Sequence, residues 1–89
     1  MQNKLNMNIF VGNLSYNLTN EALEQLFTPY GQVSSARIII DKMSGRSKGF
    51  GFVEMANEEE AQKAIAALHE SDVLGRNMIA SEARPSQKG

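Results

Sequence analysis

Residues 48–55 read KGFGFVEM, and the alternation of large and small side chains in this stretch decides the fold. Successive side chains of a β-strand point to opposite faces of its sheet. Val53 and Met55 therefore share one face, and Phe50 and Phe52 share the other. A covering layer of helices needs an apolar partner, so the valine and the methionine are predicted to face the core. The two phenylalanines are then forced outward.

A second strand is predicted at residues 8–12, which read NIFVG. The same alternation places Ile9 and Val11 in the core and Phe10 on the outer face. Neighbouring strands lie about 4.8 Å apart, so adjacency of the two strands would bring Phe10 beside the other phenylalanines. Three phenylalanines on a solvent-facing surface reduce solubility, which indicates a binding role.

Two amphipathic helices are predicted, over residues 19–30 and 57–72, because apolar side chains recur there at helical spacing. Thr19 is the expected N-cap of the first helix. In the second helix, Glu60 is expected to supply the reciprocal half of a capping box at Asn57.

Strands are also predicted at residues 33–40 and 78–83, and a polar hairpin loop follows the first of them. The resulting β-α-β-β-α-β order predicts an α+β, ferredoxin-like sandwich, with a four-stranded antiparallel sheet and two helices on one face. Eighty-nine residues fit one domain. We expect that domain at residues 8–84, after a flexible N-terminal extension at 1–7 and before a short C-terminal tail at 85–89.

The composition argues against an enzyme. The chain has no cysteine, so it has no thiolate nucleophile and no cysteine-based zinc site. Its single histidine, His69, lies at the predicted end of a helix, where a role as a favourable partner of the helix dipole is favoured over catalysis. No catalytic residue, cofactor or metal is predicted. No segment approaches the ~20 apolar residues of a membrane span, so we expect a soluble, cytoplasmic protein.

The net charge is −1, which alone does not indicate a nucleic-acid binder. The distribution of charge is more informative. The two predicted helices hold seven acidic residues against Lys63 alone, and the rest of the chain has an excess of basic residues. Since helices and strands lie in different layers, the sequence predicts an acidic helix side and a basic sheet side.

Residues 48–55 resemble the octamer of the RNA recognition motif family, K/R-G-F/Y-G/A-F-V-x-F/Y. Residues 9–14, IFVGNL, resemble the hexamer that this family carries on its first strand. The resemblance covers about residues 8–84, and the chain resembles the small single-domain RNA-binding proteins of bacteria. One departure is Met55 in place of an aromatic residue, and its inward parity indicates a change in packing only.

The resemblance implies that the chain binds single-stranded RNA, with roles in RNA processing, stability or RNA chaperoning. It implies that Phe10 and Phe50 stack on two successive bases, and that Phe52 packs against the sugars between them. Lys48 corresponds to the residue that meets the phosphate backbone.

Five other residues are predicted to contribute to RNA binding. Asn8 and Arg84 lie where members of the family hydrogen-bond base edges. Arg37 is expected to frame the aromatic surface, and Lys42 and Arg46 to surround the adjoining loop. Because positive charge is scarce, stacking should supply much of the affinity and the salt dependence should be shallow.

Several alternatives stay open at the level of sequence. Single-stranded DNA stacks as well as RNA does, and only contacts to the 2′-hydroxyl separate them. A protein partner on the helix face is a second function to consider, although domains that bind peptides in place of RNA typically lose the aromatic motifs. A monomer is favoured over a dimer that would cover the exposed sheet.

Overall fold

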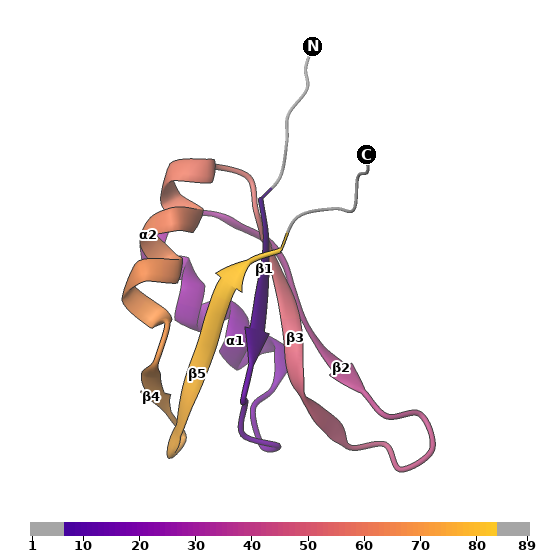
Figure 1. The fold of residues 1–89 in the computed structure, drawn as a ribbon. Coiled ribbons are helices and arrows are strands. Elements are labelled where there is room, and N and C mark those ends of the chain that lie inside the picture. The colour runs from indigo at the N-terminus through magenta and orange to yellow at the C-terminus, as the bar shows by residue number, and fades with distance from the viewer. Residues whose placement is uncertain (1–6, 84–89) are drawn as a thin grey trace.

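A five-stranded antiparallel sheet forms one layer of this computed structural model, which describes residues 7–83. The strands lie in the order β2-β3-β1-β5-β4. Both α-helices cover one face and leave the other open, as Figure 1 shows. The elements are β1 (Met7–Gly12), α1 (Asn20–Phe27), the 3₁₀ turn η1 (Thr28–Tyr30), β2 (Val33–Ile40), β3 (Ser47–Met55), α2 (Glu58–Leu68), β4 (Ser71–Val73) and β5 (Arg76–Glu82). The ferredoxin-like α+β sandwich is therefore confirmed.

The sheet has one strand more than predicted, because α2 ends earlier than its expected limit at residue 72. The backbone of His69 is already extended, at φ −61° and ψ 125°, and Glu70 takes the left-handed conformation at φ 66°. These two residues turn the chain so that Ser71 begins the short strand β4, which pairs with β5. The four-stranded prediction is corrected to five strands.

Side chains fix the start of each helix. Thr19 caps α1, as predicted, and its hydroxyl accepts a hydrogen bond from the amide of Ala22 at 3.1 Å. The Asn57 side chain caps α2 through the amide of Glu60 at 2.9 Å. The predicted capping box is incomplete, however, since the Glu60 carboxylate accepts a hydrogen bond from the amide of Gln32 at 3.3 Å instead.

The core lies between the sheet and the helices. Ile9 and Val11 of β1 and Val53 and Met55 of β3 are at most 1% exposed, so the predicted inward parity of both strands is confirmed. Gly51 is buried between strands, where a β-carbon would overlap the carbonyl oxygen of Arg37 on β2. The absence of a side chain at this position lets the two strands approach closely.

Candidate nucleic-acid interface

Three phenylalanine side chains form one aromatic cluster on the open face of the sheet, which we call the aromatic platform (Phe10, Phe50 and Phe52). Phe10 lies directly opposite Phe52 in the β1–β3 register, and their ring centroids are 5.8 Å apart. The ring of Phe50 lies 6.0 Å from that of Phe10, with 33° between the ring planes. Phe52 is 41% exposed, and the other two rings are half-buried. The predicted adjacency of the three rings is confirmed.

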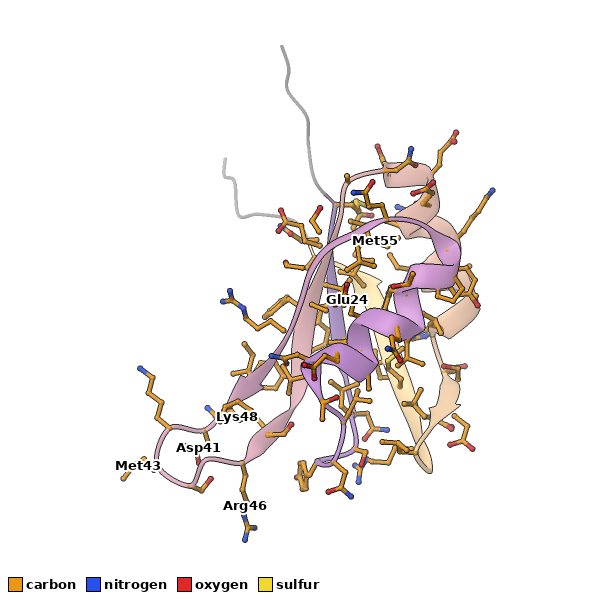
Figure 2. All side chains as sticks on the ribbon, turned by 180° about the vertical axis from the view of Figure 1, so that it is seen from behind. Glu24, Asp41, Met43, Arg46, Lys48 and Met55 are labelled. Atoms are coloured by element: carbon orange, nitrogen blue, oxygen red, sulfur yellow. The ribbon has the colours of Figure 1, made fainter. Side chains whose placement is uncertain are left out.

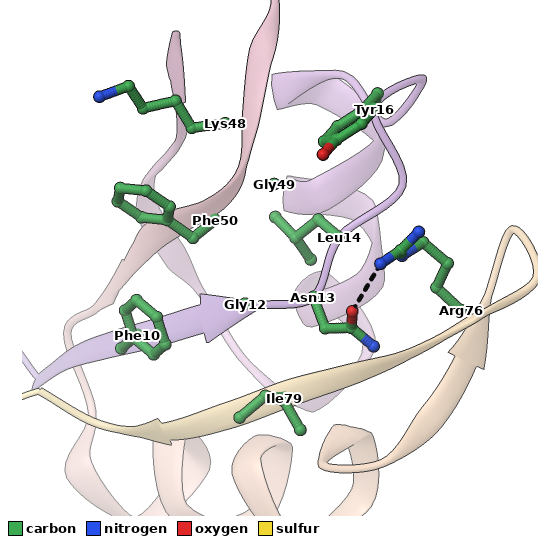
Figure 3. Close-up of a pocket in the computed structure, with 10 residues that line it drawn as sticks. All are labelled: Phe10, Gly12, Asn13, Leu14, Tyr16, Lys48, Gly49, Phe50, Arg76 and Ile79. Atoms are coloured by element: carbon green, nitrogen blue, oxygen red, sulfur yellow. Dashed lines mark hydrogen bonds between the residues drawn. The ribbon is translucent and has the colours of Figure 1, made fainter. Parts of the chain in front are cut away.

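An open hollow of about 360 Å³ adjoins Phe10 and Phe50 at the end of β1, and we call it the corner hollow (Figure 3). It is lined by Phe10, Gly12, Asn13, Leu14, Tyr16, Lys48, Gly49, Phe50, Arg76 and Ile79. The floor includes two glycines. A β-carbon at Gly12 would lie 3.0 Å from the Phe10 ring, and one at Gly49 would lie 3.3 Å from the Tyr16 ring.

A second hollow of about 410 Å³ adjoins Phe52, toward the β2 edge, and we call it the edge hollow. It is lined by Asn8, Ser35, Arg37, Ile39, Phe52, Val53 and Glu54. Since the two hollows border different rings of the aromatic platform, they extend the open face on both sides of it.

The predicted basic residues occupy different parts of this surface. Arg37 lies opposite Phe52 in the β2–β3 register and lines the edge hollow, whereas Lys48 lines the corner hollow. Arg46 lies near the outer end of the β2–β3 hairpin, as Figure 2 shows, and Lys42 is in the same loop. Neither of these two lines either hollow. The loop is braced by Asp41, whose carboxylate accepts from Ser44 Oγ at 3.2 Å.

Asn8 lies at the entrance of the edge hollow, half-buried and opposite Glu54. The backbone amide of Ala83 donates a hydrogen bond to the backbone carbonyl oxygen of Asn8 at 2.7 Å. The amide of Ala83 is therefore already used within the protein. Arg84, predicted to contact base edges, lies outside the described residues.

Three residues that the sequence analysis did not single out also line the corner hollow, namely Asn13, Tyr16 and Arg76. Tyr16 is 67% exposed in the loop between β1 and α1. Arg76, at the start of β5, donates from Nη2 to Oδ1 of Asn13 at 2.8 Å. The only signal in the sequence was an isolated tyrosine in a polar loop, and nothing local indicated that Arg76 would come beside it.

The charge of the described residues follows the predicted polarity. Three glutamates form the first turn of α2, and Glu21 lies in the first turn of α1. The basic residues Arg37, Lys48 and Arg76 line the two hollows of the open face, and Glu54 is the acidic residue among the lining residues. Residues 7–83 contain no cluster of three or more histidine, aspartate or glutamate side chains placed to hold a metal ion. No helix in that part of the chain is long and apolar enough to cross a membrane.

His69 has a structural contact that the sequence did not indicate. It follows the last residue of α2, and its Nδ1 accepts a hydrogen bond from the amide of Ala80 on β5 at 3.2 Å. Its side chain therefore ties the end of the helix to the sheet.

A family model described as the RNA recognition motif matches residues 9–79. A 29 kDa chloroplastic ribonucleoprotein of Arabidopsis thaliana is 51% identical over 75 residues, covering 84% of this chain and 22% of that protein. The putative RNA-binding protein RbpB of Nostoc is 42% identical over 81 residues, covering 91% of this chain and 79% of that protein. The chain thus spans about a fifth of the first relative and most of the second.

Solved structures agree with these relatives. The RNA-binding protein PG1 superposes with a TM-score of 0.86 and 48% identity, and the match covers 92% of this chain and 99% of that one. The Sex-lethal protein in complex with RNA superposes with a TM-score of 0.81 and 35% identity, over 85% of this chain and 47% of that one.

Proposed function

The chain belongs to the RNA recognition motif family, and we propose that it binds single-stranded RNA by stacking bases on Phe10, Phe50 and Phe52. One observation carries this proposal, namely that the rings of Phe50 and Phe52 each lie within 6.0 Å of the Phe10 ring on the face that the helices leave open. Stacking on an aromatic ring contributes about 1–3 kcal/mol per base and tolerates any base. An unpaired strand exposes its bases for such contacts, whereas a duplex does not.

The polar residues around the aromatic platform are proposed to hold the backbone and the base edges. Lys48 in the corner hollow and Arg37 in the edge hollow flank the platform, so a strand lying across it passes both cations. Asn8 borders the edge hollow, and its side-chain amide is proposed to hydrogen-bond a base edge there. Arg46 lies farther out on the hairpin (Figure 2), Lys42 belongs to the same loop, and we propose that both meet phosphates of a longer RNA.

Titration of fluorescent RNA at several salt concentrations tests the proposal. Among residues 7–83, five basic side chains lie on the open face or in its hairpin loop, namely Arg37, Lys42, Arg46, Lys48 and Arg76. Each neutralised phosphate of a single strand contributes about −0.7 to the slope of log affinity against log salt. We therefore expect a slope no steeper than about −3.5. The same RNA annealed to its complement is the control and should bind at least about tenfold more weakly.

Two results would contradict stacking as the main source of affinity. One is a salt slope much steeper than five cations can supply. The other is equal affinity for the single strand and the duplex, because a duplex can satisfy phosphate contacts but cannot lay its bases on the aromatic platform.

We further propose a role in RNA processing, stability or chaperoning, as a monomeric, cytoplasmic binding module without catalytic activity. Its membership of a family of RNA-binding domains supports this proposal. Single-stranded DNA is a proposed weaker ligand, because its bases stack equally but it lacks the 2′-hydroxyl.

A protein partner on the helix side is a second candidate function, favoured by an apolar groove of about 400 Å³ beside α1. We call it the helix-side groove, and it is lined by Leu18, Ala22, Gln25, Leu26, Asp72, Val73 and Leu74. Leu74 is 63% exposed and holds a left-handed backbone, at φ 54°, which is unfavourable for a leucine. Because Asp72 lines the groove and the helix layer is acidic, the proposed partner is a peptide with apolar side chains flanked by basic ones.

An amphipathic peptide with leucines on one face and arginines on the other tests this partner. Leu74→Ser is expected to weaken its binding about tenfold, since burial of a leucine side chain contributes about 1.5–3 kcal/mol. RNA affinity should be unchanged in this variant. Ala66→Ser, at an exposed site of α2, is the matched control. Equal binding by wild type and Leu74→Ser, or equal binding of an acidic version of the peptide, would rule this partner out.

A further inference from the structure

The loop between β1 and α1 is fastened to the two neighbouring strands at the corner hollow. The amide of Leu14 donates to the carbonyl oxygen of Gly49 on β3 at 2.8 Å. On the other side, the Asn13 side chain donates from Nδ2 to the carbonyl oxygen of Asn77 at 2.7 Å and accepts from Arg76. The loop therefore holds its side chains at defined positions beside the aromatic platform.

The side chain of Tyr16 projects from this loop and is largely exposed. It is 67% exposed and lies outside the hydrophobic core, although its ring passes over Gly49. Figure 3 shows Tyr16 and Arg76 on one side of the corner hollow, with Lys48 and Phe50 on the other. An exposed ring in a fastened loop has already lost conformational freedom, which reduces the cost of stacking a ligand on it.

The charges around the corner hollow favour an anionic ligand. Lys48 and Arg76 are the charged residues that line it, and its other lining residues are apolar, aromatic or neutral. Only one nitrogen of the Arg76 guanidinium is used by Asn13, and a guanidinium carries five N–H donors. The hollow thus combines an exposed ring on which a base can stack with a cation, held in place, that can meet its phosphate, and the glycines that line it add no side chains.

We propose that the corner hollow binds one additional nucleotide of the RNA strand that lies on the aromatic platform. The base stacks on Tyr16, and the adjoining phosphate meets Arg76. This inference rests on the proposed stacking function, and it adds a nucleotide that the three phenylalanines do not contact. The length of RNA that the domain recognises is therefore set by the loop as well as by the sheet.

Mixed-sequence RNA pools that lengthen by one nucleotide at a time test the proposal. In the wild type, one step in the series should raise the affinity at least about fivefold, as one more base stacks. In Tyr16→Ala that step should disappear, while the affinity for shorter RNA stays unchanged. Tyr16→Phe should restore the step because it keeps the ring.

The phosphate contact has its own readout. Arg76→Gln is expected to reduce the magnitude of the salt slope by about 0.7 for RNA that reaches the hollow, and to leave it unchanged for shorter RNA. Lys63→Gln removes the same charge from the exposed face of α2 and serves as the control.

Three outcomes would overturn the additional nucleotide. Tyr16→Ala could weaken binding of all lengths equally, which would show that the loop only supports the aromatic platform. Tyr16→Ala could leave every length unaffected. Free AMP could saturate the corner while RNA of every length remains bound, which would make the hollow a mononucleotide site. In each case the stacking proposal is judged separately, by the effect of Phe50→Ala on the shortest RNA that binds.

Discussion

Replacing Phe50 by alanine is expected to weaken binding of single-stranded RNA by about 5- to 150-fold, which corresponds to ~1–3 kcal/mol for one stacked base. The ring of Phe50 is half-buried and lies beside Phe10 on the open face, outside the hydrophobic core. Its removal therefore takes away a stacking surface while the packing of Val53 and Met55 beneath the sheet is retained. Affinity should fall while the fold is kept.

Fluorescence anisotropy with labelled RNA measures the affinity, and circular dichroism of the same sample reports the fold. Ile40→Ala is the matched control, because Ile40 is an exposed apolar residue of β2 that lines neither hollow. It should bind RNA as the wild type does. Unchanged affinity in a folded Phe50→Ala variant would mean that the aromatic platform is not the binding surface.

The parity of two strands was predictable because it follows from a local rule with only one acceptable solution. The helices require an apolar sheet face, Ile9, Val11 and Val53 can supply it, and the intervening phenylalanines are left outside. In the structure, Ile9, Val11 and Val53 face the core and are at most 1% exposed, and the phenylalanines lie on the outer face. The same rule predicted that Arg37 would flank the aromatic platform, and β2 keeps this residue opposite Phe52 although its register shifts on both sides.

Features that depend on contacts between distant residues were not predictable in this way. Glu60 satisfies the sequence pattern of a capping box, yet its carboxylate bonds to Gln32, which is 28 residues away along the chain. Arg76 lines the corner hollow and is held there by a hydrogen bond to Asn13, which is 63 residues away along the chain. A helical pattern likewise does not reveal that Glu70 will adopt a left-handed backbone and end α2 before β4. Each of these outcomes is set by packing that no local pattern encodes.

Phe27→Ala is expected to lower the stability of the fold, whereas Phe50→Ala lowers RNA affinity. The expected loss is about 3–5 kcal/mol in the free energy of unfolding. Phe27 ends α1, is fully buried and is the largest of the fully buried side chains. Its truncation removes apolar contacts and leaves a cavity between the helix and the sheet. The free energy of unfolding of a typical domain is only about 5–15 kcal/mol, so such a loss removes much of the stability.

Urea denaturation followed by circular dichroism measures this loss, and Phe27→Leu supplies a smaller truncation for the case in which the alanine variant does not fold. We expect the leucine variant to keep wild-type RNA affinity at low urea, since the aromatic platform lies on the opposite side of the sheet from Phe27. An alanine variant with the urea midpoint of the wild type would contradict the placement of Phe27 in the core. The two substitutions start from the same residue type, so their separate effects on affinity and stability distinguish a phenylalanine that binds a ligand from one that holds the fold.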